Sequence, residues 1–482
     1  MTATLRYVAA AAALLLSAAC GKSPSIDRNS TQGGSSSEII AYIDMRLAGE
    51  YYWLDEVRAK QKRFDRSLPF DKYLRQSLLS LTTNTDDGYI NSSGTRTPYS
   101  YIRKIADGTR AEGSAAGFGI ELCSTVLVTD NDKLLFTVEY VYEDSPAAEA
   151  GLRRADIISG CDGRPVDRNN YAELYAALQG SSRESMSITV LHTGSDRTST
   201  VTLHRDTYRE NPVLCCKTID SPATGRRVGY LAYASFDSDF EQQLSDALDY
   251  LAAQRLDDMI LDLRCNGGGS VSTSTMLASR LLGTRYEGQV YAELRRNPLN
   301  TADPSPTICR IAKTDRPLDI ERLTVIASDA TASASEMLVV GLRGLGIDVK
   351  LVGTRTRGKN CGMDVTRRTV GGVQYEYAPV TFLNFNAEGF NDYGGGLLPD
   401  VDVRSGLGDA SQRYYPLATA DWGDAEGDIA LRAALQLADG IDPARTSLPR
   451  RTSLPAHTRT VTLSYDEPRM TLTPEERRSF DD

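Results

Sequence analysis

From residue 227 onward, short apolar runs alternate with stretches that repeat apolar residues every three or four positions. The run 323–328 is apolar and rich in β-branched residues, which predicts a short buried strand, and the run 349–353 predicts a second one. Between them, residues 336–345 have the apolar spacing of a helix. This order predicts an α/β core, in which two parallel strands bring both ends of the segment to one edge of a sheet.

The junction between the first strand and the helix carries candidate chemistry, because residues 331–337 read Thr-Ala-Ser-Ala-Ser-Glu-Met. A serine at a tight strand-to-helix turn, here Ser333, has an exposed hydroxyl, and its neighbours' N–H groups are unpaired at the helix start. Such N–H groups can stabilise a developing oxyanion. Ser333 is therefore a candidate nucleophile.

A serine nucleophile needs a base, and none of the three histidines lies in a motif: His192, His204 and His457. A lysine serves instead when burial or nearby cations disfavour its charge. Lys359 follows Gly358 just after the second predicted strand, so we expect it at the same sheet edge as Ser333. Arg355 and Arg357 are nearby cations that would favour a neutral Lys359 if they point toward it.

Charge and cysteine content indicate which partners and cofactors the chain is not expected to bind. The chain has 482 residues, enough for more than one core, and its formal net charge of −10 argues against a nucleic-acid partner. Its eight cysteines show no C-x-x-C spacing and no histidine companions, so we expect no metal site and no cofactor. Most of these cysteines are expected to be small buried residues, with a disulfide between Cys265 and Cys361 as an alternative.

The N-terminus has the pattern of an export signal. Residues 1–19 combine Arg6 with a short apolar stretch that is too short to span a bilayer. The run that ends at Cys20 resembles a bacterial lipobox, so Cys20 is expected to carry a lipid anchor. Residues 20–37 then form a flexible polar linker. These features predict a membrane-anchored lipoprotein of the bacterial cell envelope, facing the periplasm or the cell surface.

Residues 38–112 are expected to form a helical N-terminal region, in which Asp86 and Asp87 lie in a solvated turn. Residues 113–207 have the order of elements of a PDZ domain, including a Ser-Pro-Ala-Ala-Glu-Ala-Gly-Leu turn and helix. The segment Gly117, Phe118, Gly119 and Ile120 resembles the PDZ loop that binds a peptide's terminal carboxylate through backbone N–H groups.

Several motifs together resemble the C-terminal processing, or tail-specific, serine peptidase family. They are Thr-Ala-Ser-Ala-Ser-Glu at 331–336, the later Gly358-Lys359, and Leu-Asp-Leu-Arg-Cys-Asn-Gly-Gly-Gly at 261–269. The resemblance implies an α/β, multi-domain fold with a crotonase/ClpP-like core that carries a Ser/Lys dyad. It assigns Ser333 and Lys359 to catalysis and the backbone N–H groups of Gly268 and Ala334 to the oxyanion hole. Many members carry a glutamine four residues after the lysine, where this chain has Met363.

The remaining segments complete the predicted organisation. Residues 208–404 are expected to form the peptidase core, 405–440 a C-terminal helical segment, and 441–482 a disordered tail rich in Pro, Thr and Arg. The predicted function is a serine endopeptidase that acts on envelope or periplasmic proteins, with PDZ-mediated substrate capture or gating. Two alternatives stay open: an inactive PDZ-containing scaffold lipoprotein, and a crotonase-like acyl-CoA enzyme. The sequence does not specify the oligomeric state.

Overall fold

The protein is described here from a computed structural model. The described residues are 36–91, 94–105, 113–129, 133–167, 169–180, 183–195, 197–404, 415–443, 458–462 and 469–472. Predictions for the signal peptide, Cys20 and the linker up to residue 35 lie outside these residues. No helix within the described ranges is both long and apolar enough to cross a membrane.

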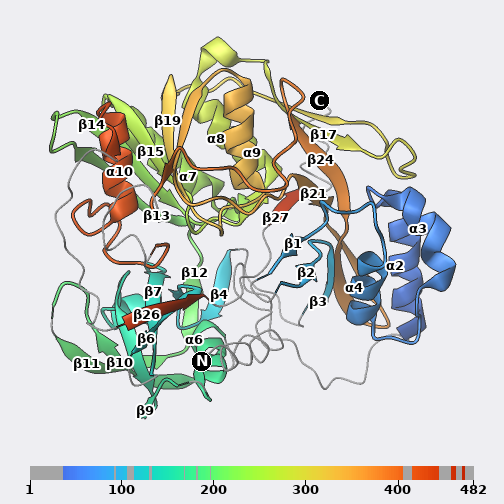
Figure 1. Cartoon of the computed structure of the whole chain (residues 1–482), viewed down its shortest axis with the longest axis horizontal. Coiled ribbons are helices and arrows are strands. Elements are labelled where there is room, and N and C mark those ends of the chain that lie inside the picture. Colours follow the sequence, from blue (N-terminus) through green and yellow to red (C-terminus); the bar gives the residue numbers. More distant parts are fainter. Residues whose placement is uncertain are drawn as a thin grey trace.

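The core is built on a sheet whose central strands are parallel (Figure 1). Its order is β13 (Val213–Asp220), β14 (Arg227–Tyr233), β15 (Asp258–Asp262), β19 (Arg322–Ala327), β20 (Asp348–Gly353) and β25 (Val401–Asp402). Helices α7 (Glu241–Ala252), α8 (Val271–Leu282) and α9 (Ala334–Gly344) pack on one face. Helix α10 (Ile429–Ala438) covers the other face.

Successive side chains along the strands point to opposite faces of the sheet, which explains why helices cover both faces. In β14, Leu231 belongs to the cluster under α7 to α9, whereas its neighbour Tyr230 belongs to the cluster under α10. The neighbouring pair Val325 and Ile326 in β19 divides in the same way. Because successive side chains of a strand point to opposite faces, a fully apolar strand needs a helical layer on both sides.

A second sheet flanks the core, and one of its strands comes from the end of the described chain. Its order is β16 (Gly268–Ser270), β27 (Arg469–Leu472), β21 (Cys361–Asp364), β24 (Val380–Asn386), β17 (Val290–Arg296) and β18 (Thr307–Arg310). Strands β22 (Thr366–Val370) and β23 (Val373–Ala378) form a hairpin that pairs with β3 (Tyr101–Lys104). Strands β23 and β24 are consecutive in the chain but belong to different sheets.

The PDZ-like region has one main sheet, of order β11-β10-β8-β7-β6-β26, in which β26 is Thr458–Thr462. Its strands are β5 (Ile120–Leu122), β6 (Thr125–Thr129), β7 (Leu134–Val141), β8 (Ile157–Cys161), β9 (Arg164–Pro165), β10 (Ser185–Leu191) and β11 (Thr198–His204). A separate pair joins β4 (Ser114–Gly117) to β12 (Asp206–Arg209). The helices are α5 (Pro146–Glu149) and α6 (Tyr171–Gln179), and α6 packs against β5.

The N-terminal region combines helices with short strands. Helices α2 (Ser36–Glu50), α3 (Leu54–Lys60) and α4 (Phe70–Leu79) lie at the right of Figure 1, whereas the PDZ-like region lies at the lower left, below the core. Strands β1 (Tyr89–Ile90) and β2 (Arg96–Thr97) form a small hairpin. The prediction of a solvated turn at Asp87 is wrong, because this carboxylate is fully buried. It accepts hydrogen bonds from the hydroxyl groups of Tyr51 and Ser100 and from the N–H groups of Tyr99 and Ser100.

Two further expectations are corrected. Within the predicted disordered tail, β26 (Thr458–Thr462) and β27 form strands that pair with β6 and with the second sheet. Main-chain hydrogen bonds to unpaired strand edges order these residues, and composition does not report such bonds. Cys265 and Cys361 are both free; the first thiol donates to the Glu139 carboxylate (3.2 Å) and the second to the Asp86 carbonyl (3.2 Å).

Candidate active site

Ser333 lies at the turn between β19 and α9, as the apolar pattern predicts. Its backbone has φ 64° and ψ −116°, a conformation that is strained for a residue with a Cβ. Its side chain is fully buried, and Oγ has no hydrogen-bond partner among the residues that the structure describes. The prediction of an exposed hydroxyl is therefore wrong for this conformation, whereas the strained strand-to-helix turn is the one expected of a nucleophilic serine.

Glu336 links the Ser333 turn to the Lys359 loop. One carboxylate oxygen, Oε2, accepts hydrogen bonds from the N–H groups of Ser333 (2.9 Å) and Lys359 (2.8 Å). The other, Oε1, accepts from the Gly358 N–H (2.7 Å) and from the Thr356 hydroxyl. We call this set of contacts the Glu336 bridge. Because a single oxygen is shared, the backbones of Ser333 and Lys359 are held next to each other.

Burial and hydrogen bonding have opposite effects on the ionisation of the Glu336 carboxylate. Burial of the whole side chain raises the pKa of Glu336, and hydrogen bonds from Thr356, Ser333, Lys359 and Gly358 oppose that rise. Each donor stabilises the ionised carboxylate that burial disfavours. The bridge therefore depends on all of its donors being in place.

Gly358 allows the lysine loop to approach its neighbours. Its φ is +88°, and a Cβ at this position would lie 2.4 Å from the Gly394 carbonyl oxygen and 2.4 Å from the Gly396 nitrogen. Only glycine fits such a position without displacing backbone. The following Lys359 is fully buried, and its Nζ lies 4.9 Å from the centre of the Tyr99 ring.

The loop after β15 is tied to the Ser333 turn by side chains of small residues. Thr331 donates from Oγ1 to the Leu263 carbonyl (2.7 Å), and Ser335 donates from Oγ to the Asn266 carbonyl (3.0 Å). The Ala332 N–H also donates to the Asn266 carbonyl (3.2 Å). These bonds explain why small hydroxylic residues fill the turn, and they place the glycine run beside Ser333.

The two expected oxyanion donors differ in their surroundings. Ala334 is the first residue of α9, where N–H groups lack intrahelical partners, and it is fully buried. Gly268 has φ 103°, and its N–H donates to the Asn266 side-chain oxygen (2.9 Å). In this conformation the Gly268 N–H is therefore engaged by the protein itself.

Arg355 and Arg357, the cations expected to act on Lys359, make other contacts. Arg355 donates to the Gly395 carbonyl (3.0 Å), and Arg357 donates to the Asp329 carbonyl (2.7 Å) while its guanidinium lies 4.7 Å from the Tyr89 ring centre. Both side chains thus have partners other than the lysine. Met363, at the position of the family's glutamine, is fully buried in the cluster beneath the N-terminal helices. It contributes packing there.

The expected carboxylate-binding loop lies at the start of β5. Phe118 and Ile120 are buried, and Gly119 has φ +73° with no room for a Cβ beside Ser145. Strand β5 pairs with β7 along one edge and contacts α6, through a hydrogen bond from the Tyr175 hydroxyl to the Leu122 carbonyl (3.4 Å). This neighbourhood of strand and helix is the one that the PDZ prediction requires.

A contact that the sequence did not reveal joins the PDZ-like region to the candidate site. Glu139, on β7, accepts hydrogen bonds from the Cys265 thiol (3.2 Å) and from the Arg154 guanidinium (2.6 Å). The Arg154 guanidinium in turn lies 3.7 Å from the centre of the Trp422 ring. Cys265 belongs to the loop that carries Gly268, so the PDZ-like region contacts the loop of the candidate oxyanion hole.

A Ser-His-Asp hydrogen-bond chain exists elsewhere, within the PDZ-like sheet. His192 bonds to Asp156 through Nδ1 (3.2 Å) and to the Ser199 hydroxyl through Nε2 (2.7 Å). Ser199 lies within strand β11 and is paired with Val190 of β10. Ser199 is within a strand and not at a helix start, so it lacks the cluster of unpaired N–H groups at which an oxyanion could bind. We interpret this chain of bonds as structural.

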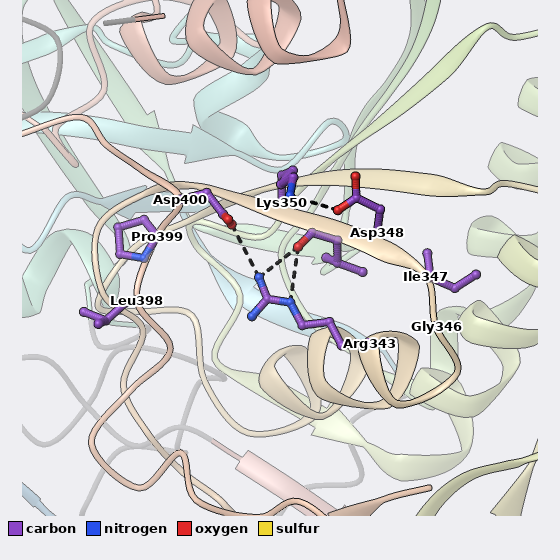
Figure 2. Close-up of a pocket in the computed structure, with 9 residues that line it drawn as sticks. Arg343, Gly346, Ile347, Asp348, Lys350, Leu398, Pro399 and Asp400 are labelled. Atoms are coloured by element: carbon purple, nitrogen blue, oxygen red, sulfur yellow. Dashed lines mark hydrogen bonds and ion pairs between the residues drawn. The ribbon is translucent and has the colours of Figure 1, made fainter. Parts of the chain in front are cut away.

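A surface pocket lies at the opposite end of α9 from Ser333 (Figure 2). Arg343, in the last turn of α9, donates to the Val349 carbonyl (2.8 Å) and to the Asp400 carboxylate (3.4 Å). Asp400 also accepts from the Leu351 N–H (2.8 Å). These bonds fasten the helix end to β20 and the chain after Pro399. The pocket is separated from Ser333 by most of an eleven-residue helix, about 15 Å at 1.5 Å per residue.

Comparisons with known proteins show which families the chain resembles. Residues 227–403 match Peptidase family S41, and residues 137–191 match the PDZ domain family. A carboxyl-terminal-processing protease of Picosynechococcus is 28% identical over 319 residues, which cover 66% of this chain and 70% of that protein. One of Synechocystis is 28% identical over 298 residues, covering 61% of this chain and 63% of that protein.

A solved structure shares the fold. A putative S41 protease from Bacteroides fragilis superposes with a TM-score of 0.61 at 23% identity. The match covers 83% of this chain and 97% of that one. The multi-domain α/β architecture with a PDZ domain is therefore that of the S41 proteases.

The Glu336 bridge predicts a specific loss of stability. In Glu336→Gln, an amide NH₂ group replaces one acceptor oxygen and faces N–H donors, which leaves buried groups unpaired. We expect a loss of about 1–3 kcal/mol in the free energy of unfolding, measured by urea denaturation. The matched control is Glu321→Gln, whose side chain is 81% exposed and which should change stability by less than about 0.5 kcal/mol. Equal stability of the two variants would contradict the bridge.

Proposed function

We propose that this chain, which belongs to the C-terminal processing peptidases of family S41 and carries a PDZ domain, is a serine endopeptidase that uses Ser333 and Lys359 as its catalytic dyad. One observation carries the proposal: a single oxygen of Glu336 accepts the N–H groups of both residues, at 2.9 and 2.8 Å. Residues from two separate loops are thereby brought together at the end of two parallel strands.

The residues have distinct roles in peptide hydrolysis. Ser333 Oγ attacks the scissile carbonyl, and Lys359 Nζ accepts its proton and then delivers it to the leaving amine. A water molecule then hydrolyses the acyl-enzyme and regenerates Ser333. Full burial of Lys359 supports this role, because burial disfavours the ammonium form that cannot act as a base.

The oxyanion of the tetrahedral intermediate is stabilised by the N–H groups of Ala334 and Gly268. For Gly268 to take part, its N–H must leave the Asn266 side-chain oxygen, 2.9 Å away. The contact of Glu139 with Cys265 gives the PDZ domain a route to that rearrangement, because Cys265 lies in the same loop as Gly268. Substrate capture at the PDZ domain can thus be coupled to assembly of the oxyanion hole.

The substrate is a protein or peptide, captured at its carboxyl terminus. The N–H groups of the loop Gly117–Ile120 bind the terminal carboxylate, and the captured segment adds to β5 beside α6. A lipid on Cys20 anchors the enzyme to a bacterial envelope membrane, with the peptidase facing the periplasm or the cell surface.

An inactive PDZ scaffold is the second candidate function, and the replacement of the family's glutamine by Met363 favours it. A thioether cannot donate a hydrogen bond. Asn360 does not replace that donor directly, because its side-chain N–H groups bond to Asn391 (3.1 Å) and approach Asp86 (3.4 Å). The Glu336 bridge fixes the lysine backbone without a glutamine, and we therefore favour the active enzyme.

Loss of either dyad residue should abolish turnover. We expect Ser333→Ala, Lys359→Ala and Lys359→Arg to remove essentially all cleavage of an unfolded protein substrate, because arginine does not deprotonate in proteins. Cleavage is measured by release of new amino termini.

Ser199→Ala serves as the control, since the Ser199 hydroxyl is hydrogen-bonded to His192 in the Ser-His-Asp chain of the PDZ-like sheet, and this variant should retain full activity. Substantial turnover in Lys359→Arg would remove Lys359 from the role of base. A wild-type chain with no turnover would favour the scaffold.

Recognition of a terminal carboxylate predicts a difference between free and amidated peptides. A peptide with a free carboxyl terminus should bind at least tenfold more tightly than its amidated form, because the charge-assisted hydrogen bonds to the loop N–H groups are lost. Isothermal titration with Ser333→Ala prevents cleavage during the measurement. Equal affinities would assign the PDZ domain to gating without terminal recognition.

The lipid anchor predicts membrane partitioning that depends on one thiol. Cys20→Ser expressed in a bacterial host should move the protein from the membrane fraction to the soluble fraction, because the acylated residue is lost. Immunoblots of separated fractions measure the shift, with Cys161→Ser as the control cysteine. A Cys20→Ser protein that stays in the membrane fraction would require another anchor.

A further inference from the structure

Strand β27 occupies a slot between β16 and β21, the two strands that border the candidate active site. Figure 1 shows β27 beside β21. It runs parallel to β16, with Arg469 opposite Gly268 and Thr471 opposite Ser270. On its other edge it runs parallel to β21, with Thr471 opposite Met363 and Leu472 opposite Asp364. The four residues 469–472 are thus bound through their main chain on both sides.

Both walls of this slot continue directly into the proposed catalytic residues. Strand β16 begins at Gly268, and β21 begins at Cys361, two positions after Lys359. Without β27, the described strands β16 and β21 have no strand between them. A slot with two unpaired edges beside a nucleophile and a base is where an extended polypeptide would bind for cleavage.

The same part of the chain also contacts the PDZ domain. Strand β26 (Thr458–Thr462) pairs antiparallel with β6 at the edge of the PDZ sheet, from Thr458 opposite Thr129 to Thr462 opposite Thr125. Two short strands from one segment therefore reach the PDZ domain and the catalytic slot. Attachment at β6 raises the effective concentration of residues 469–472 near the slot.

We propose that residues 469–472 act as a built-in competitor that occupies the substrate slot between β16 and β21 and holds the peptidase in a resting state. The inference rests on the proposed function, because it requires this slot to bind substrates. The Gly268 N–H is bonded to Asn266 in the same structure, so the slot is filled while the oxyanion hole lacks one donor. A segment bound under these conditions is held without being cleaved.

A chain that ends at Thr462 tests the proposal, since it keeps β26 and lacks β27. In the shortened chain the substrate no longer competes with residues 469–472 for the slot. The KM for an unfolded protein should therefore fall on the order of tenfold relative to the full chain. A synthetic peptide of residues 463–476 added to the shortened chain should raise KM with kcat unchanged. A peptide of the same composition in scrambled order should have no effect.

A substitution in the full chain separates the effect of losing strand β27 from the effect of shortening the chain. Thr471 lies opposite residues of both neighbouring strands, so Thr471→Pro, which removes an N–H and disfavours a central strand, should reproduce the fall in KM. Thr471→Val keeps the backbone donor and should behave as wild type. Intact mass spectrometry should find residues 469–482 present in both wild type and Ser333→Ala.

The outcomes distinguish this inference from the proposed function. Equal KM for the full and shortened chains, together with turnover that depends on Ser333, would overturn the competitor and leave the peptidase intact. Loss of the segment from wild type but not from Ser333→Ala would show that it is cleaved as a substrate, which also overturns a resting-state role. Absence of turnover in every chain would instead contradict the proposed function.

Discussion

The hydrogen bonds of the Glu336 carboxylate are the constraint on which the candidate site depends. A fully buried carboxylate is costly unless its oxygens are paired, and here both oxygens accept donors from the loop that follows β20. The same carboxylate accepts the N–H of Ser333, whose backbone is strained. These hydrogen bonds oppose the cost of burial, and they connect the serine turn to the lysine loop.

The parallel sheet supplies the frame within which this bridge forms. Strands β15, β19 and β20 are neighbours and parallel, so the loops that follow them meet at one edge. Thr331 and Ser335 then bond the serine turn to the loop after β15, which carries Gly268. That loop is also the one that Glu139 of the PDZ domain contacts. Ser333, Lys359, Gly268 and the contact with the PDZ domain thus lie on one connected set of backbone segments.

Much of this could be predicted from the sequence, because the strand–helix–strand pattern around Ser333 places Lys359 at the same sheet edge. The role of Glu336 was missed, although its spacing of three residues from Ser333 is that of a capping box. Asp87 was predicted to be solvated because a charged pair in a turn usually is, and its partner Tyr51 is distant in sequence. The tail strands were missed because main-chain pairing to an open strand edge depends on no particular side chain.

The central claim is that Ser333 is a nucleophile activated by Lys359, and covalent labelling tests it most directly. A fluorophosphonate probe phosphonylates an activated serine oxygen with release of fluoride, and peptide mass spectrometry locates the modified residue. The account predicts a single label on Ser333 that is absent from Lys359→Arg and present in Ser199→Ala. A label on Ser199, or equal labelling of Ser333 in Lys359→Arg, would contradict it.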